Sequence, residues 1–425
     1  MSSHNNPVKA ARHGFTLVEI LVVITIIGIL TAIAIPAINN AVGTARDTAI
    51  KMELGTIADL VQRYSEEYHD YPPDFSDWDV VERHFRKAFP RINDNELRIL
   101  AQFTHVTSSG ARCNTGGGPT DPRTNTSYSH YPHAIDRAEA LVFCLGGFSK
   151  DIQRPFTGVG GPLVLATGGT DPYVTGTATN SDFLQYQYNT DRDGGTLDMV
   201  RLSVTVSGGN ATSSDDGSNA LGFFALADPF PVYTPKNSSV PFAYFDSRTY
   251  DTAFGTVYTS GAPVWYASQP VASINCYCPA AGGATLADVG AARPMASTTI
   301  DTTPPTTIQG STVAGTVLEF ANKNTFQLIS GGRDGNYGGT MSGTGVGSAA
   351  HGISVFPLGI YYNPFFTHSS ANTTIGVTAS SIGKYQDDDV MTSEYGVSSR
   401  IFGVNAQLDN NTNFCDSSIL GNELP

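Results

Sequence analysis

The stretch G-FTLVEILVVITIIGILTAIAI-P, from Gly14 to Pro36, decides how the rest of this 425-residue chain is organised. The 21 residues from Phe15 to Ile35 carry a single charged side chain, that of Glu19. About 20 apolar residues in a helix span the hydrocarbon core of a bilayer, whereas an amphipathic helix of a soluble protein shows a polar stripe. The sequence therefore predicts a membrane-spanning helix, and the preceding Lys9 and Arg12 predict a cytoplasmic N-terminus.

A small residue, Gly14, lies before the apolar run and not after it, where the cleavage site of a secretory signal would be. The order Gly14-Phe15-Thr16-Leu17-Val18-Glu19, followed by Pro36, resembles the N-terminus of the type IV prepilin family, which includes type IV pilins and the pseudopilins of type II secretion. The resemblance implies that prepilin peptidase cuts between Gly14 and Phe15 and methylates the new N-terminal Phe15. An uncleaved anchor and a secretory signal are the alternatives.

Glu19 is a carboxylate one helical turn into the predicted span, where an ionisable side chain is costly and by default functional. In a filament, its partner would be the N-terminal amine of Phe15 on a neighbouring subunit, a contact that sets the register between subunits. The alternative is that Glu19 lies at the level of the lipid headgroups. Pro36 lacks an N–H, so we expect a kink or a local opening of the helix. The resemblance implies that this proline lets part of the helix melt on assembly.

The charge balance is acidic, with a net charge of −14 at pH 7, and loss of Lys9 and Arg12 with the leader would make it more negative. This balance argues against nucleic-acid binding and discourages wide contact with anionic lipid. Beyond the membrane the compartment is oxidising, so disulfides are allowed. We expect zero to two, with unknown pairing, among Cys113, Cys144, Cys276, Cys278 and Cys415.

The sequence predicts an α+β, pilin-like fold in which a long N-terminal helix packs on an antiparallel sheet with large loop insertions. Helical periodicity continues beyond the apolar run as far as Pro72-Pro73. Further helices are expected over 74–105, with Asn93 or Asp94 as a cap, and over 134–148, ending at Gly146-Gly147. Short β-type runs at 163–165, 199–206, 242–245 and 325–329 predict strands.

These patterns predict five parts: a leader (1–14), a transmembrane or filament-core helix (15–36), its amphipathic continuation (37–71), a helical insertion (72–155) and a β-rich globular head (156–425).

A glycine-rich turn after the strand at 326–330 and a later segment, 408–414, resemble the calcium loop of the major pseudopilin of type II secretion. Calcium takes six to eight oxygen ligands. The resemblance points to the carbonyl of Leu328 and the side chains of Ser330, Asp334, Asp409 and Asn410. The two halves are far apart here, whereas the family loop is short. The run 387–389, three aspartates inside the insertion, is therefore an alternative source of ligands, and a solvated turn without metal is another.

Other candidate sites are weaker. The acidic turn at 191–195 is expected to form a hairpin, and His130 and His133 are expected to lie in a loop. We find no nucleophile, base and orienting acid in a catalytic arrangement, and predict a structural protein, not an enzyme.

The resemblance implies a filament subunit that is processed by prepilin peptidase and assembles at an inner-membrane platform with copies of itself and other pilin-like subunits. Its head would lie in the periplasm before assembly, and afterwards in a pilus or pseudopilus that could reach the cell surface. The alternative is a membrane-tethered binding or enzymatic head that uses the leader only as an anchor.

Overall fold

A computed structural model gives the fold of the chain, which divides into two compact units, 1–46 and 47–425, considered separately below. The structure describes residues 16–104, 106–107, 110–111, 135–166, 169, 171, 186–192, 195, 197, 205–207, 210–212, 230–250, 258–259, 262–263, 292, 294–300, 307–308, 311–313, 318–335, 337, 353–355, 360–362, 374–375, 382–384 and 411–415.

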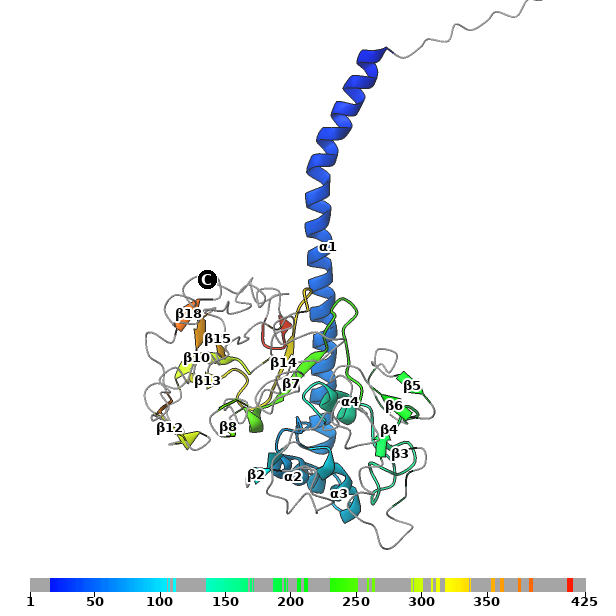
Figure 1. Ribbon diagram of the computed structural model, residues 1–425, viewed down its shortest axis with the longest axis vertical. Coiled ribbons are helices and arrows are strands. Elements are labelled where there is room, and N and C mark those ends of the chain that lie inside the picture. Colours follow the sequence, from blue (N-terminus) through cyan, green and yellow to red (C-terminus); the bar gives the residue numbers. More distant parts are fainter. Residues whose placement is uncertain are drawn as a thin grey trace, which may run out of the picture. The chain divides into compact units, whose positions relative to one another are not determined.

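Helix α1 runs from Leu17 to Tyr68 (blue in Figure 1) and is 52 residues long. Its side chains in the first unit are almost all exposed, whereas a stripe in the second unit is buried. That stripe consists of Ile50, Leu54, Ile57, Val61 and Tyr64, which recur every three or four residues and so lie on one face of the helix. The helix ends where His69 adopts a left-handed conformation with φ of 56°, before the prolines at which the sequence predicts its end.

In the described residues, three short α-helices follow α1, all within ranges where the sequence predicts helix. They are α2 (Trp78–Ala88), α3 (Asp94–Gln102) and α4 (Glu139–Leu145). Asn93 is the N-cap of α3, and its side chain accepts a hydrogen bond from the backbone N–H of Asn95, which confirms one of the two predicted caps. Helix α4 ends at Gly146, followed by Gly147 at φ of 91°, as the glycine pair predicts.

A three-stranded antiparallel sheet has the order β19 (Asn411–Thr412), β14 (Phe326–Ser330) and β7 (Phe242–Asp246), labelled in part in Figure 1. Strands β14 and β7 pair along five residues, and β14 and β19 along two. Both long strands, and β3 at 163–165, coincide with predicted strands. Of the range predicted at 199–206, only its end is described, within β5.

The remaining described strands form further sheets of two to five strands each. They are β1 (Val106–Thr107) with β2 (Gly110–Ala111); β3 (Leu163–Leu165) with β4 (Tyr186–Tyr188); β5 (Thr205–Ser207) with β6 (Asn210–Thr212); β8 (Tyr258–Thr259) with β9 (Ala262–Pro263); β11 (Thr307–Ile308), β12 (Ser311–Val313) and β17 (Thr374–Ile375); and β13 (Leu318–Phe320), β10 (Ala296–Ile300), β15 (Ile353–Val355), β16 (Ile360–Tyr362) and β18 (Ile382–Lys384). Pairing among these strands is antiparallel except between β10 and β15 and between β12 and β17.

The residues of β7 alternate between two hydrophobic clusters, so the sheet is covered on both faces. Phe242 and Tyr244 lie in the larger cluster with the helices, whereas Ala243 and Phe245 lie in a smaller one. This explains why every residue of β7 is buried. The protein is thus a mixed α+β fold, as predicted.

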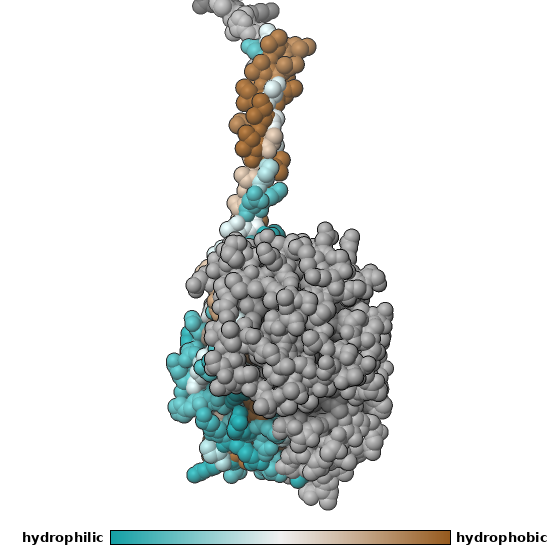
Figure 2. Space-filling view, turned by 90° about the vertical axis from the view of Figure 1, so that its left-hand side faces the viewer, coloured by the Kyte–Doolittle hydropathy of each residue, from teal (hydrophilic) through white to brown (hydrophobic). Residues whose placement is uncertain are grey.

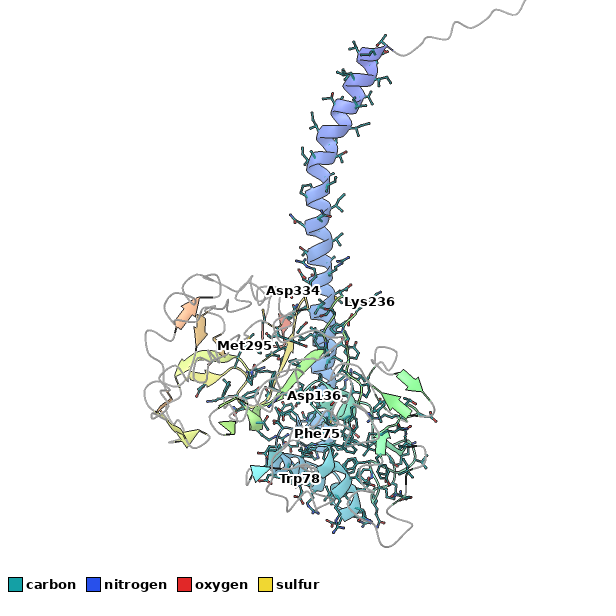
Figure 3. The ribbon with its side chains drawn as sticks, in the orientation of Figure 1. Phe75, Trp78, Asp136, Lys236, Met295 and Asp334 are labelled. Carbon is teal, nitrogen blue, oxygen red and sulfur yellow. The ribbon has the colours of Figure 1, made fainter. Side chains whose placement is uncertain are left out.

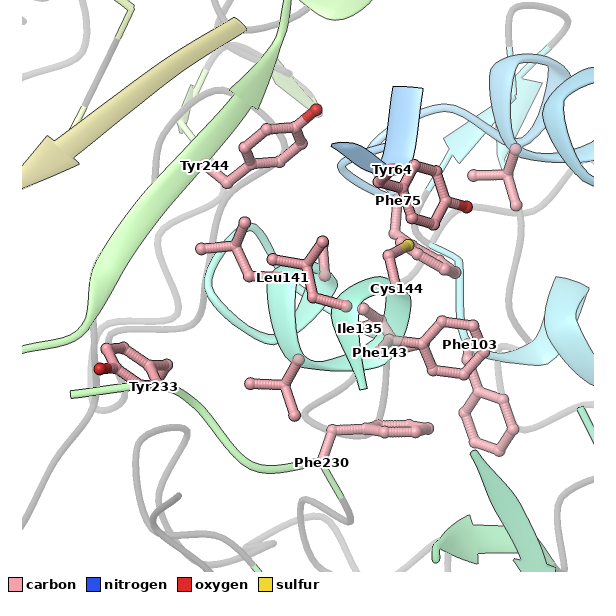
Figure 4. Packing of buried hydrophobic residues seen from close by; sticks show 14 of the residues in the cluster. Tyr64, Phe75, Phe103, Ile135, Leu141, Phe143, Cys144, Phe230, Tyr233 and Tyr244 are labelled. Atoms are coloured by element: carbon pink, nitrogen blue, oxygen red, sulfur yellow. The ribbon is translucent and has the colours of Figure 1, made fainter. Parts of the chain in front are cut away.

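Aromatic rings fill the larger cluster (Figure 4). The Phe85 and Phe156 ring centroids are 4.8 Å apart with nearly perpendicular planes, and Phe75 and Phe143 are 5.2 Å apart in a similar arrangement. Edge-to-face pairs of this kind contribute about 0.5–1.5 kcal/mol beyond the burial of their area. The ring of Phe85 on α2 also contacts Phe143 on α4 and Phe75, which lies after the end of α1, with centroids 6.3 and 6.2 Å apart. These rings therefore pack α2 and α4 against each other and against the segment that follows α1 (Phe75 and Trp78 are labelled in Figure 3).

Candidate functional site

The first turn of α1 is closed by a reciprocal pair of hydrogen bonds between Thr16 and Glu19. Glu19 Oε2 accepts from the backbone N–H of Thr16 at 2.7 Å and from Thr16 Oγ1 at 2.8 Å, while Thr16 Oγ1 accepts from the N–H of Glu19 at 3.2 Å. This is a capping box, in which helix-terminal donors and side chains satisfy each other. The T-x-x-E spacing signals it, but our sequence analysis considered only partners outside the helix. Gly14 and Phe15 lie outside the described residues, so the cut between them stays a prediction.

An uninterrupted apolar surface follows Glu19. The exposed fractions include 54% for Leu21, 60% for Ile24, 62% for Leu30 and 69% for Ile33, and the helix is long and apolar enough to cross a membrane. In Figure 2, the part of the helix above the grey head is mostly brown, that is hydrophobic, on the face shown. Exposed apolar surfaces of this extent mark protein or membrane contacts.

Helix α1 continues through Pro36 without a break. The predicted local opening is therefore not present in the single chain, and an opening on assembly stays a prediction. Pro36 still leaves the carbonyl of Ala32 without its usual helical donor, because proline has no N–H.

The two segments predicted to approach each other near the C-terminus do lie side by side. Ser330 of β14 pairs with Asn411 of β19, and the N–H of Leu328 donates to Asn413 Oδ1 at 2.9 Å. The carbonyl of Leu328 accepts from the N–H of Asn413 at 3.3 Å. Asp334 is exposed on the turn after β14 (labelled in Figure 3), which is shaped by left-handed Gly332 and Gly335.

The calcium prediction is only partly covered by the described residues. Ser330 is buried and its Oγ accepts from the N–H of Gly332, whereas Asp409, Asn410 and the aspartates 387–389 lie outside the described part. Within the part that the structure describes, no group of three or more His, Cys, Asp or Glu side chains is placed to hold a metal. Calcium binding stays a prediction.

Helix α1 contacts this C-terminal region through two residues one turn apart, Asp47 and Lys51. Lys51 Nζ donates to the backbone carbonyl of Thr412 at 2.7 Å and to that of Cys415. Asp47 Oδ2 lies 3.5 Å from Arg333 Nη1, on the turn that also carries Asp334. Burial raises the pKa of Asp47, and the charge of Arg333 opposes that rise. Sequence analysis missed both contacts, because spacing along the helix does not identify a partner far away in the chain.

A buried polar network connects α1, α2 and the end of β7. The Tyr64 hydroxyl lies 2.7 Å from His84 Nε2, His84 Nδ1 lies 3.2 Å from Asp70 Oδ2, and Arg248 Nη1 donates to the same oxygen at 2.6 Å. Burial lowers the pKa of His84, against the influence of Asp70. Burial also opposes ionisation of Asp70, but His84 and Arg248 hold its pKa at about 2.

The network ends at a second carboxylate, Asp246, whose two oxygens accept from Arg248 Nε at 3.0 and 2.8 Å. Burial raises the pKa of Asp246 to about 6 even though Arg248 favours the charged form. Because Tyr64 and His84 are also buried, we assign the network to holding the helices against the sheet.

The acidic turn at 191–195 has a structural role that its sequence does not reveal. Arg192 donates to the carbonyls of Val142 and Phe143, each at 2.7 Å, and to that of Gly147. These carbonyls lie at the C-terminal end of α4, where the last carbonyls of a helix lack helical donors. That of Val142 also accepts from the N–H of Gly146. Cys144 and Cys415 are buried, and neither forms a disulfide with a described residue; the other cysteines, and His130 and His133, lie outside the described residues.

Comparison with known proteins bears on the N-terminal end. Residues 9–35 match the family model of the prokaryotic N-terminal methylation motif. The chain has a type IV prepilin-like N-terminus. This prepilin-like segment is similar to the type IV major fimbrial protein FimA of Dichelobacter nodosus, with 37% identity over 54 residues, or 13% of this chain and 35% of that protein.

Two further relatives share the prepilin-like segment. The type IV major alpha-pilin of Moraxella bovis is 48% identical over 44 residues, which are 10% of this chain and 28% of that protein. The type II secretion system core protein G of Pseudomonas aeruginosa is 37% identical over 64 residues, 15% of this chain and 45% of that protein. The matches thus span less than half the length of these relatives. No solved structure matches the chain at comparable significance.

Proposed function

We propose that the chain is a structural subunit of a type IV pilus-like or type II secretion pseudopilus filament. The observation that carries the proposal is the exposed, almost entirely apolar first part of α1, with one carboxylate, Glu19, at its start. An apolar helix that is uncovered in the single chain needs lipid before assembly and other copies of such a helix afterwards. The methylation motif over 9–35 supports the same role.

In this proposal, prepilin peptidase cuts after Gly14 and methylates Phe15, and an inner-membrane platform inserts the subunit into a filament. The head stays on the periplasmic side until then. Within the filament, Glu19 exchanges its intrachain bonds with Thr16 for the amine of Phe15 on a neighbouring copy or another pilin-like subunit. That exchange replaces neutral donors by a cation, which strengthens the hydrogen bond in an apolar setting. Pro36 provides the point at which the helix opens.

The test is replacement of Glu19 by alanine in the full chain, expressed in its own host with its assembly machinery. In Glu19→Ala, no subunit should be recovered in filaments that are sheared from the cells, whereas the amount of subunit in the membrane should not change. Sedimentation and immunoblotting measure both amounts. Thr25→Ala is the matched control, because Thr25 is also in the apolar part and its hydroxyl donates only to the carbonyl of Leu21 among the bonds described. Filaments of Glu19→Ala at the control level would contradict the proposal.

Mass spectrometry of the mature N-terminus separates this proposal from a tethered binding or enzymatic head. A mature chain that begins with N-methylated Phe15 supports the filament subunit. A chain that still begins at Met1, or one released from the membrane as a soluble head, would support the alternative.

A further inference from the structure

We propose that the charged ammonium group of Lys51 attaches β19, an edge strand of the β19-β14-β7 sheet, to α1. The ammonium group donates to two backbone carbonyls, those of Thr412 and Cys415, which lie three residues apart at the end of β19. Two carbonyl oxygens directed at one point form an electronegative site that a cation satisfies. The proposal concerns the folded head and does not depend on filament assembly.

Strand β19 is too short to hold its place by backbone pairing alone. It pairs with β14 through two residues, whereas β7 pairs with β14 through five. Side chains must therefore supply most of the attachment. Asn413 provides one such contact, since its Nδ2 donates to the carbonyl of Phe326 at 3.3 Å and its Oδ1 accepts from the N–H of Leu328. Asn413 thus attaches the end of β19 to the neighbouring strand β14. Among the contacts described above, only those of Lys51 attach the carbonyls of Thr412 and Cys415 to helix α1.

The surroundings of Lys51 favour a charged contact. The Lys51 side chain is partly buried, and its neighbours on the helix, Ile50 and Leu54, are fully buried. One turn earlier, Asp47 pairs with Arg333 of the turn after β14, so the ends of two adjacent strands are tied to one face of α1 by charged groups. Hydrogen bonds that involve a charged group are roughly twice as strong as neutral ones.

If the charge of Lys51 is removed, residues 411–415 should detach from α1 while the rest of the head stays folded. Lys51→Met keeps most of the apolar stem and removes the ammonium. Amide hydrogen exchange at 411–415 should then be faster by about ten- to a hundredfold, which is the loss expected for a charge-assisted hydrogen bond. Exchange in β7 should be unchanged. Lys323→Met is the control, because Lys323 forms an exposed pair with Glu319. The full chain in detergent micelles is used throughout.

Chemical rescue identifies the charge as the cause. In Lys51→Ala, the missing part of the side chain has the size of n-propylammonium, which can therefore fill the space. The control is n-propanol, a neutral molecule of similar shape. We expect n-propylammonium, but not n-propanol, to restore slow exchange at 411–415. Unchanged exchange in Lys51→Met, equal acceleration in β7 and β19, or equal rescue by n-propanol would each overturn the proposal.

Discussion

The Tyr64 hydroxyl of α1 and Nε2 of His84 on α2 lie 2.7 Å apart in a region from which solvent is excluded. Because Asp70 is ionised and faces Nδ1 at 3.2 Å, a neutral His84 donates from Nδ1 and accepts the Tyr64 proton at Nε2. The rings also stack, with centroids 5.6 Å apart. Asp70 and Tyr64, on the two nitrogens, thus fix the tautomer of His84, and the bond to Tyr64 joins α2 to α1.

Tyr64→Phe should destabilise the head by about 1–3 kcal/mol, because it leaves Nε2 of His84 buried without a donor. Urea unfolding followed by circular dichroism measures the change. Tyr71→Phe is the matched control, since the Tyr71 hydroxyl donates to Gln62 at 3.1 Å in an exposed position. The control should change the free energy of unfolding by less than about 0.5 kcal/mol, and equal effects of the two variants would contradict the assigned role.

Asp70 should make part of the stability dependent on acid pH. Its pKa in the folded head, about 2, is below the value of about 3.9 in an unfolded chain. Ionised Asp70 therefore stabilises the fold above about pH 4, and this contribution is lost as the pH falls towards 2. The difference in unfolding free energy between wild type and Asp70→Asn should be constant near neutrality and shrink below pH 4.

Asp191→Asn, at an exposed position, controls for the loss of one carboxylate in that titration. Its difference from wild type should stay small at every pH. A difference between wild type and Asp70→Asn that does not vary between pH 5 and pH 2 would show that Asp70 is not held in its charged form.

Arg192→Lys should destabilise the head by about 2–4 kcal/mol even though it keeps the charge. The guanidinium reaches three carbonyls at the end of α4 through a planar arrangement of donors, which an ammonium cannot reproduce. At least one buried carbonyl would lose its donor. Arg86→Lys, in an exposed pair with Glu82, should have little effect in the same denaturation experiment.

Calcium should stabilise the head if the turn after β14 and the segment before β19 bind it. At a hundredfold excess over Kd, binding to the folded state alone adds about 2.7 kcal/mol. We therefore expect thermal unfolding of the full chain at a higher temperature in excess calcium than in chelator, and no such shift for Asp334→Asn. Identical unfolding of the wild type in calcium and chelator would refute calcium binding.

Local features of this fold followed from the sequence. The continuation of α1 to Tyr68, the cap at Asn93, the glycine end of α4 and the strands at 163–165, 242–245 and 326–330 each depend on residues within a few positions of one another. The meeting of β14 and β19 was suggested by resemblance to a family loop, although a long insertion intervenes.

Contacts over long sequence distances did not follow. Arg248 meets Asp70, Lys51 meets Thr412 and Arg192 meets Val142, each across 50 or more positions. A lone charged residue in a polar segment carries no information about which distant group it will contact, because either sign of partner occurs in many places. The acidic turn at 191–195 illustrates this, since the residue that matters most in it is its arginine.

The position of β19 has a consequence for the order in which the protein is built. Closing a loop of about 80 residues between β14 and β19 costs conformational entropy, and only two paired residues offset that cost. We therefore expect this pairing to form slowly. Ribosomes make β19 only after β14 and the whole loop between the two strands. Until then, the free edge of β14 can pair with a strand of another chain. A chain that stops before β19 should thus aggregate through this edge, and pairing of β19 with β14 prevents that association.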